Sequence, residues 1–196
     1  MKVTQPNIIE TGRLLLRPFE DDDAIAAHTW FGDPVVMKYV PSGPDVSVSR
    51  TRERLARYRA HQDRHGFSKW LVLERSSGRP IGDAGLLISE ENDLPDGWRA
   101  DRPSLRDEGG TSAPVWVDLG FRFQQPSWRQ GYATEAAAAW VSVAFGSLGL
   151  NVLRAYAHPE NLGSLKVLER LGFLDDRRDT VQGMPVVCYR LRRRQP

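Results

Sequence analysis

The segment from Val115 to Ala139 constrains the fold more than any other stretch, because a strand, a short turn and a helix follow one another in it. The turn ends at Gly131, and an alanine-rich helix runs from Thr134 to about Gly146. Alternate positions of the strand are apolar and share one face, namely Val115, Val117, Leu119, Phe121 and Phe123. Such a unit is typical of a sheet covered by helices.

The glycine turn and the helix start together suit an anionic ligand. Gly131 allows the backbone to approach a ligand closely, and a helix N-terminus offers unpaired N–H groups and a partial positive charge. These features predict a seat for a phosphate or pyrophosphate. A buried helix packed closely on a sheet explains the same residues, so the turn alone does not decide. The turn lacks the dinucleotide fingerprint and the Gly-Lys-Ser/Thr of a nucleoside-triphosphate loop.

The other hydrophobic patterns predict further strands and helices around this unit. Ser47 or Ser49 can cap the second helix, and Asn161 or Ser164 the last one. The order predicts a mixed sheet with helices on both faces. Strands are expected at 13–17, 67–74, 80–88, 152–157 and 184–192, a further late strand is expected to begin at 173–174, and helices are expected at 21–31, 50–65 and 165–171.

A single domain is expected over residues 1–196, because no repeat or linker divides the chain. Residues 89–112 are polar and rich in Gly, Pro and Asp, which is typical of an inserted loop. Whether Trp98 within this loop touches a substrate is open.

Composition argues against several classes of protein. The formal net charge is +2, so a dedicated nucleic-acid binder is not expected. No run approaches ~18 apolar residues, so no membrane span is expected. The single cysteine, Cys188, excludes an internal disulfide and a Cys-based metal site, and the reducing cytoplasm is the expected compartment. The arginine-rich helix 50–65 is expected to be a solvated surface, with a grip on an acidic partner as the alternative.

The phrase from Trp128 to Ala136, Trp-Arg-Gln-Gly-Tyr-Ala-Thr-Glu-Ala, resembles the acetyl-CoA motif of GNAT-superfamily N-acetyltransferases. Its form resembles the branch of ribosomal-protein N-terminal (Rim-type) acetyltransferases. Three further segments agree with that branch in order: 11–18, 117–121, and 161–164 running to 171–173. The resemblance implies a single GNAT-like α/β (α+β) domain, with a mostly antiparallel sheet of six to seven strands.

The resemblance also implies a cofactor site for acetyl-CoA as co-substrate. Backbone N–H groups of residues 130–133 would hold the pyrophosphate, and the pantetheine arm would lie between strands 115–123 and 152–157. Backbone N–H groups near Leu119 and Gly120 would face the thioester oxygen. The implied cofactor-binding residues are Leu119, Gly120, Phe121, Trp128, Arg129, Gln130, Gly131, Tyr132, Ala133, Thr134, Asn161 and Ser164.

Acid–base chemistry is carried by fewer candidates. Ser164 matches the family serine near the sulfur and is the candidate acid, with helix capping as its alternative role. Asp118 would bind the acceptor ammonium or relay its proton, or it is a surface-facing strand residue. His158 has the pKa range of a base, or is a plain loop histidine. Some relatives use a glutamate as the base in the segment where this chain has Asp176 and Asp179. Because the segment has no glutamate, we assign no general base there.

Arg129 departs from the pattern, because relatives commonly have glycine after the motif tryptophan. Its side chain would pair with a CoA phosphate or crowd the turn. The 89–112 insert would reshape the acceptor side.

The sequence therefore predicts an acetyl-CoA-dependent N-acetyltransferase that works by direct attack in a ternary complex. The acceptor is a protein α-amine, a lysine or a small cationic amine. A non-catalytic acyl-CoA-binding or sensing module is the alternative. No nucleic-acid or membrane partner is expected, and the protein is a monomer or a homodimer.

Overall fold

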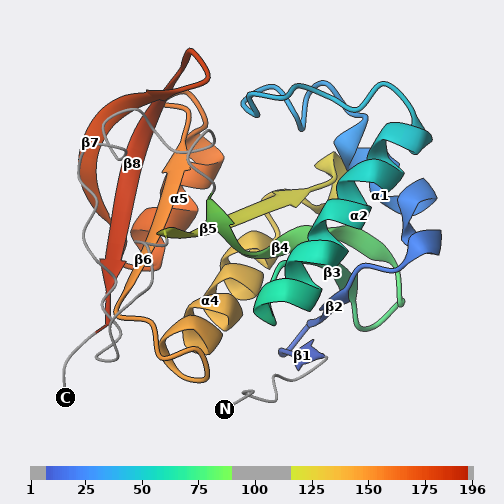
Figure 1. Cartoon of the computed structure of the whole chain (residues 1–196), viewed down its shortest axis with the longest axis horizontal. Coiled ribbons are helices and arrows are strands. Elements are labelled where there is room, and N and C mark those ends of the chain that lie inside the picture. The colour runs from blue at the N-terminus through green and yellow to red at the C-terminus, as the bar shows by residue number, and fades with distance from the viewer. Residues whose placement is uncertain (1–7, 90–115, 194–196) are drawn as a thin grey trace.

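The computed structural model describes residues 8–89 and 116–193, which form one eight-stranded sheet with helices on both faces. The predicted insert and Trp98 lie outside the described residues. In spatial order the strands are β1 (Ile9–Glu10), β2 (Leu14–Pro18), β3 (Lys69–Glu74), β4 (Pro80–Ser89), β5 (Trp116–Phe123), β6 (Val152–Ala157), β8 (Met184–Arg192) and β7 (Leu174–Val181) (Figure 1). The predicted mixed sheet is confirmed, and the short β1 is the strand that the sequence patterns did not indicate.

The sheet opens between its two central strands. β5 and β6 are the parallel pair, and their ladder has one register pair, Asp118 with Arg154. The antiparallel ladder between β4 and β5, in contrast, runs from Gly82–Phe123 to Ser89–Trp116. β5 therefore leaves β6 directly after Asp118. Figure 1 shows β6, β8 and β7 standing at a steep angle to β2–β5.

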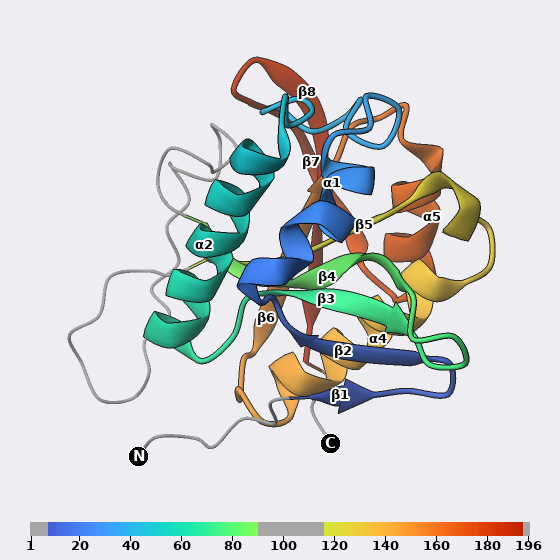
Figure 2. The same ribbon diagram turned by 90° about the vertical axis from the view of Figure 1, so that its right-hand side faces the viewer.

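The two faces of the sheet carry different helices. α4 (Tyr132–Phe145) and α5 (Leu162–Arg170) pack on one face, where the indole rings of Trp70 and Trp140 meet edge to face at 4.9 Å. α1 (Ala24–Phe31) and α2 (Val48–His65) pack on the other face around Leu71 (Figure 2). Because successive residues of β3 point to opposite faces, neighbouring positions such as Trp70 and Leu71 belong to separate cores.

Helix ends agree with the sequence signals in type and differ by a few residues in position. Ser47 caps α2 by accepting from the Arg50 N–H at 3.2 Å, and Gly66 ends α2 in the left-handed region. Asn161 is the cap of α5, so the helix starts three residues before the predicted 165. No helix in the described ranges is both long and apolar enough to cross a membrane.

Candidate active site

The start of α4 offers backbone N–H groups to a ligand. Gly131 is its N-cap residue at φ 83°, a conformation in the left-handed region that favours glycine. Since glycine has no side-chain oxygen to accept from the first turn, these N–H groups are available to an anion. The helix begins at Tyr132, two residues earlier than predicted, and the turn before it is exposed.

A pair of side chains far apart in the sequence pins this turn to β2. The Glu135 carboxylate accepts from the Thr11 hydroxyl at 2.6 Å, from the Arg13 backbone N–H at 2.8 Å and from Arg13 Nε at 2.7 Å. Arg13 also donates to the Gln130 carbonyl at 2.8 Å and stacks over the Tyr132 ring at 4.7 Å. Burial opposes ionisation of Glu135, but the bonds from Thr11 and Arg13 outweigh it and lower the pKa of Glu135. The segments around residues 11–18 and 128–136 therefore form one unit.

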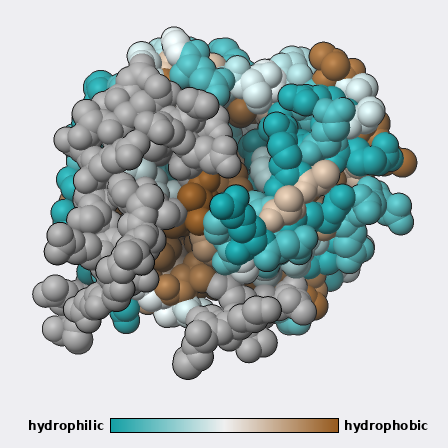
Figure 3. Space-filling model, viewed as in Figure 1, coloured by the Kyte–Doolittle hydropathy of each residue, from teal (hydrophilic) through white to brown (hydrophobic). Residues whose placement is uncertain are grey.

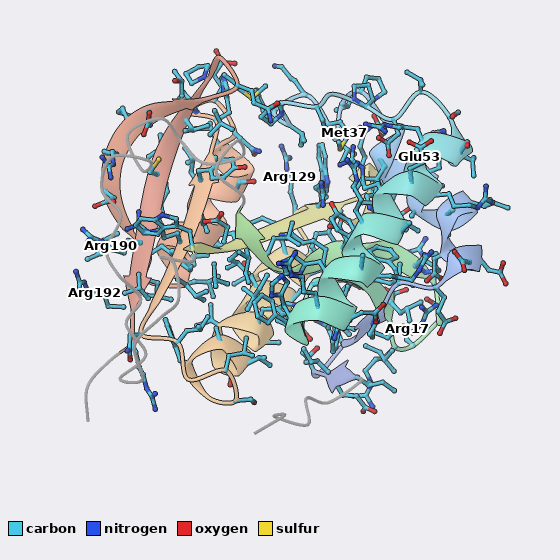
Figure 4. All side chains as sticks on the ribbon, viewed as in Figure 1. Arg17, Met37, Glu53, Arg129, Arg190 and Arg192 are labelled. Carbon is cyan, nitrogen blue, oxygen red and sulfur yellow. The ribbon has the colours of Figure 1, made fainter. Side chains whose placement is uncertain are left out.

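Trp128 and Arg129 shape the turn in different ways. The Trp128 indole N–H donates to the Phe123 carbonyl at 2.6 Å, which ties the turn to the end of β5. Arg129 has φ 60°, where an L residue costs roughly 1–2 kcal/mol. Its side chain is exposed and lies between the α2 half and the β6–β8 half (Figure 4). The departure from glycine thus strains the backbone.

Leu119, Gly120 and Phe121 lie in β5 just beyond its separation from β6. Leu119 packs into the core on the α4 side, whereas Gly120 belongs to the opposite face together with Asp118 and Arg122. Figure 3 shows hydrophobic atoms in a recess near the middle of the molecule, beside the hydrophilic surface of α2. The residues predicted to face a thioester are thus placed at the point where the sheet opens.

Lys69 reaches the same point, although no sequence pattern indicated a role for it there. Residues 69, 85 and 120 are in register across β3, β4 and β5. The lysine side chain crosses this row: Nζ donates to the Gly85 carbonyl at 2.9 Å, and a Cβ on Gly120 would collide with Nζ. A glycine in mid-strand can mark a bulge or a close approach, and at Gly120 the approaching group is this amine.

Asp118 is buried at 7% exposure, so the alternative of a surface-facing strand residue is wrong. Across the β5–β6 pair lies Arg154, whose guanidinium covers the Trp116 ring at 3.1 Å. Burial lowers the pKa of Arg154 to about 10, although the charges of Asp176 and Asp118 oppose that change. Asp118 thus lies among cations at the base of the opening.

The α5 candidates divide between capping and other roles. Asn161 Oδ1 accepts from the Ser164 N–H at 3.2 Å, so Asn161 is the cap. The capping role considered for Ser164 is therefore wrong, and its partly buried hydroxyl stays the candidate acid. His158 Nδ1 accepts from the Glu160 N–H at 3.1 Å, and its ring stacks on Tyr39 at 4.7 Å. This stack joins the α1–α2 connection to the end of β6.

The two aspartates considered after Gly172 and Phe173, Asp176 and Asp179, both accept hydrogen bonds from other groups of the chain. Asp176 accepts from Arg190 at 2.6 Å and lies 4.0 Å from Arg154. Asp179 accepts from the Thr180 N–H at 2.8 Å. In the ranges that the structure describes, no cluster of His, Cys, Asp and Glu side chains could hold a metal ion. Cys188 is fully buried, and burial raises the pKa of its thiol to about 12.

Comparison with known proteins identifies the class that this fold defines. The family described as "Acetyltransferase (GNAT) domain" matches residues 13–174. The uncharacterized N-acetyltransferase p20 of Bacillus licheniformis is 28% identical over 83% of this chain and 80% of its own. An acetyltransferase from Agrobacterium tumefaciens is 24% identical with a TM-score of 0.74, covering 96% of each chain. The RimL ribosomal L7/L12 α-N-protein acetyltransferase, solved with coenzyme A, shares the fold at 14% identity, with a TM-score of 0.70 over 94% of this chain and 97% of that one.

The chain therefore belongs to the GNAT acetyltransferase family and is an acetyl-CoA-dependent acyltransferase in type. In fold it resembles the Rim-type branch.

Proposed function

We propose that the protein transfers an acetyl group from acetyl-CoA to a primary amine by direct attack in a ternary complex. The observation that carries this proposal is the start of α4, with Gly131 at its N-cap, held by the Arg13–Glu135 unit at the open end of β5 and β6. A helix start and a parted pair of strands in this order suit a pyrophosphate with a long arm attached.

The cofactor is proposed to follow the opening from α4 toward Asp118. The N–H groups of residues 130–133 would bind the pyrophosphate, Arg129 would pair with a phosphate, and Trp128 and Thr134 would flank it. The pantetheine arm would lie between β5 and β6, within reach of the Asn161 side-chain NH₂, since Oδ1 is occupied by the cap. The thioester would then meet the backbone of residues 119–121.

Catalytic roles are proposed for two side chains at the inner end of this path. Ser164 would protonate the departing thiolate. Asp118, buried beside cations, would attract the ammonium form of the acceptor. The acceptor is proposed to be a protein α-amine or a small cationic amine, and to enter beside the stacked Tyr39 and His158. We propose the cytoplasm as the compartment and a monomer or homodimer as the working unit.

A binding and turnover experiment tests the proposal. Acetyl-CoA at about 100 times its Kd is expected to add roughly 2.7 kcal/mol of stability, and thiol release is expected with peptides or polyamines as acceptors. Gly131→Ala is expected to reduce the stabilisation by acetyl-CoA, because alanine resists φ 83° and its Cβ would lie 3.3 Å from Arg13 Nη2. Gly149→Ala is the matched control: it has φ 63°, open space around it, and lies beyond the other end of α4.

The outcomes separate the proposal from its rivals. Binding without thiol release for any amine would favour an acyl-CoA-binding module. Equal losses of acetyl-CoA affinity in the two glycine variants would remove the α4 start as the pyrophosphate seat.

A further inference from the structure

Lys69 is a buried cation placed without a carboxylate partner. It is 6% exposed and is the first residue of β3, although lysine is almost never fully buried unless paired. In the described ranges, no carboxylate lies within salt-bridge distance of Nζ, and its hydrogen bond goes to the Gly85 carbonyl. An ion pair therefore does not explain why the Lys69 side chain is buried.

The surrounding residues clear a path that brings Nζ to β5. A Cβ on Gly85 would collide with the Ser68 carbonyl, and a Cβ on Gly120 would collide with Nζ itself. Gly120 thus leaves room for the lysine amine, and Gly85, in register with both, allows the backbones of β3 and β4 to approach closely. Its nitrogen occupies the place that a side chain of residue 120 would take, one residue beyond Leu119 and at the opening of the sheet.

The charges around Nζ favour its neutral form. Burial is the largest cause, Arg122 adds repulsion, and Asp83 and Asp118 oppose both, with the result that the pKa of Lys69 falls to about 7. Asp83 is held by Arg122 at 2.6 Å. From α2, Tyr58 accepts from Arg122, and His61 bonds the backbone of residues 67 and 88. Asp83, Tyr58 and His61 are therefore committed to partners other than Lys69.

We propose that Lys69 is the general base of the acetyl transfer, taking a proton from the acceptor ammonium next to Gly120. This inference rests on the proposed function. The lone pair of neutral Nζ accepts one proton from R–NH₃⁺, and the freed amine attacks the thioester carbon. The C–S bond then breaks, the thiolate leaves and is protonated, and the amide nitrogen loses its second proton. The net products are the acetylated amine, CoA thiol and one proton released to solvent.

The position explains why a base is useful there. The attacking amine must be neutral, whereas alkyl amines are protonated at neutral pH. A base works best when its pKa lies near the operating pH, and burial places this lysine in that range. Asp118 lies on the same strand and the same face as Gly120. It would hold the acceptor ammonium before Lys69 removes the proton.

Two variants distinguish a base from a structural strut. Lys69→Gln keeps an N–H donor for the Gly85 carbonyl but has no basic nitrogen, and Lys69→Met removes both. Ser68→Ala is the control, because Ser68 is also buried at the adjacent position and its hydroxyl has no hydrogen-bond partner among the residues that the structure describes. We would measure kcat and KM from pH 5.5 to 9.5, together with the Kd of acetyl-CoA for each protein.

The wild-type protein is expected to show a rise in kcat/KM with an apparent pKa near 7. Both Lys69 variants are expected to lose on the order of 10²-fold in kcat/KM at pH 7 and to shift that rise toward the pKa of the acceptor, with acetyl-CoA affinity within about threefold of wild type. Ser68→Ala should keep the wild-type profile.

Several results would overturn the inference. If Lys69→Gln restores the wild-type profile while Lys69→Met does not, the lysine is a strut for Gly85. If both variants keep wild-type activity and the rise in kcat/KM near pH 7, the base is another group, and the proposed function still stands. If the wild-type protein binds acetyl-CoA and releases no thiol with any amine, the proposed function fails and the base role fails with it. If Lys69→Met does not fold, Lys69→Gln decides alone.

Discussion

Two cations lie on the same face of the sheet, the buried Lys69 and the partly buried Arg122, and among the described residues only Arg122 has a carboxylate partner. Arg122 forms a two-point pair with Asp83 at 2.6 and 3.0 Å, donates to the Tyr58 hydroxyl at 2.8 Å and covers the Phe31 ring at 4.7 Å. These contacts outweigh its burial and raise the pKa of Arg122 above its ordinary value. Lys69, on β3, has the Gly85 carbonyl instead, and its pKa falls.

This difference assigns a structural role to Arg122 and is consistent with a role in proton transfer for Lys69. The planar guanidinium of Arg122 matches a carboxylate at two points and stays charged, so it fixes β4, β5 and α2 to one another. An ammonium without such a partner loses its proton readily when buried. The α1–α2 side of the sheet therefore serves as a rigid frame around Lys69.

The largest expected effect comes from breaking the paired cation. Arg122→Met leaves Asp83 buried without its partner, which should cost about 3–5 kcal/mol of unfolding free energy. Lys69→Met removes an unpaired amine and should cost much less at pH 7. Urea unfolding measures the unfolding free energy of both variants. Similar losses in the two variants would show that both cations contribute to stability in the same way.

The pH dependence of stability should sharpen the contrast. The folded-state pKa of Lys69, about 7, lies below its unfolded value, so between these values the unfolded chain binds more protons. The unfolding free energy should then rise from pH 7 toward pH 10, by at most about 1.4 kcal/mol per pH unit. Lys69→Met should remove this rise, and an identical slope in the variant would contradict the assignment.

A smaller effect is expected at the unit that holds the turn before α4. Glu135→Gln should cost about 1–2 kcal/mol, because bonds of a charged carboxylate to Thr11 and Arg13 are weakened. The depressed pKa of Glu135 means that its contribution is present above its unfolded value and is lost as pH falls. The difference in stability between wild type and variant should therefore narrow as pH falls below about 4, and a difference that stays constant there would point to packing instead.

The smallest expected effect concerns backbone strain. Arg129→Gly should raise the stability of the free protein by roughly 1 kcal/mol while weakening acetyl-CoA binding, because a cation beside the turn is lost. Gln182→Gly is the control, since Gln182 is the other non-glycine residue with positive φ among the described residues, at 49° in the β7–β8 turn. A loss of affinity in Gln182→Gly equal to that in Arg129→Gly would rule out a local role for Arg129.

Hydrophobic period and turn residues were enough to predict the sheet and its helices. The alternation of β5 and the glycine ends of α2 and α4 are local signals, and local signals survive in the sequence. The family resemblance added the turn at 128–136 and the separation of β5 from β6, which the single Asp118–Arg154 register pair confirms. It did not distinguish Asn161 from Ser164 as the cap of α5.

Contacts between distant segments could not be predicted in the same way. Glu135 contacts Thr11 across a separation of 124 residues, and no local pattern in either segment indicates this contact. Lys69 is similar: its environment depends on register across three strands. A glycine in mid-strand such as Gly120 is compatible with a close approach, but the glycine does not identify the group that approaches it.

The most direct test of the account is an NMR titration of Lys69 in the folded protein. The ¹³Cε resonance of Lys69, assigned by its loss in Lys69→Gln, would be followed with pH. The role of Lys69 as the base predicts a midpoint near pH 7. A midpoint for Lys69 in the ordinary range of lysine, about 10.4, would show that it is a buried ammonium at neutral pH and would contradict its role as the base.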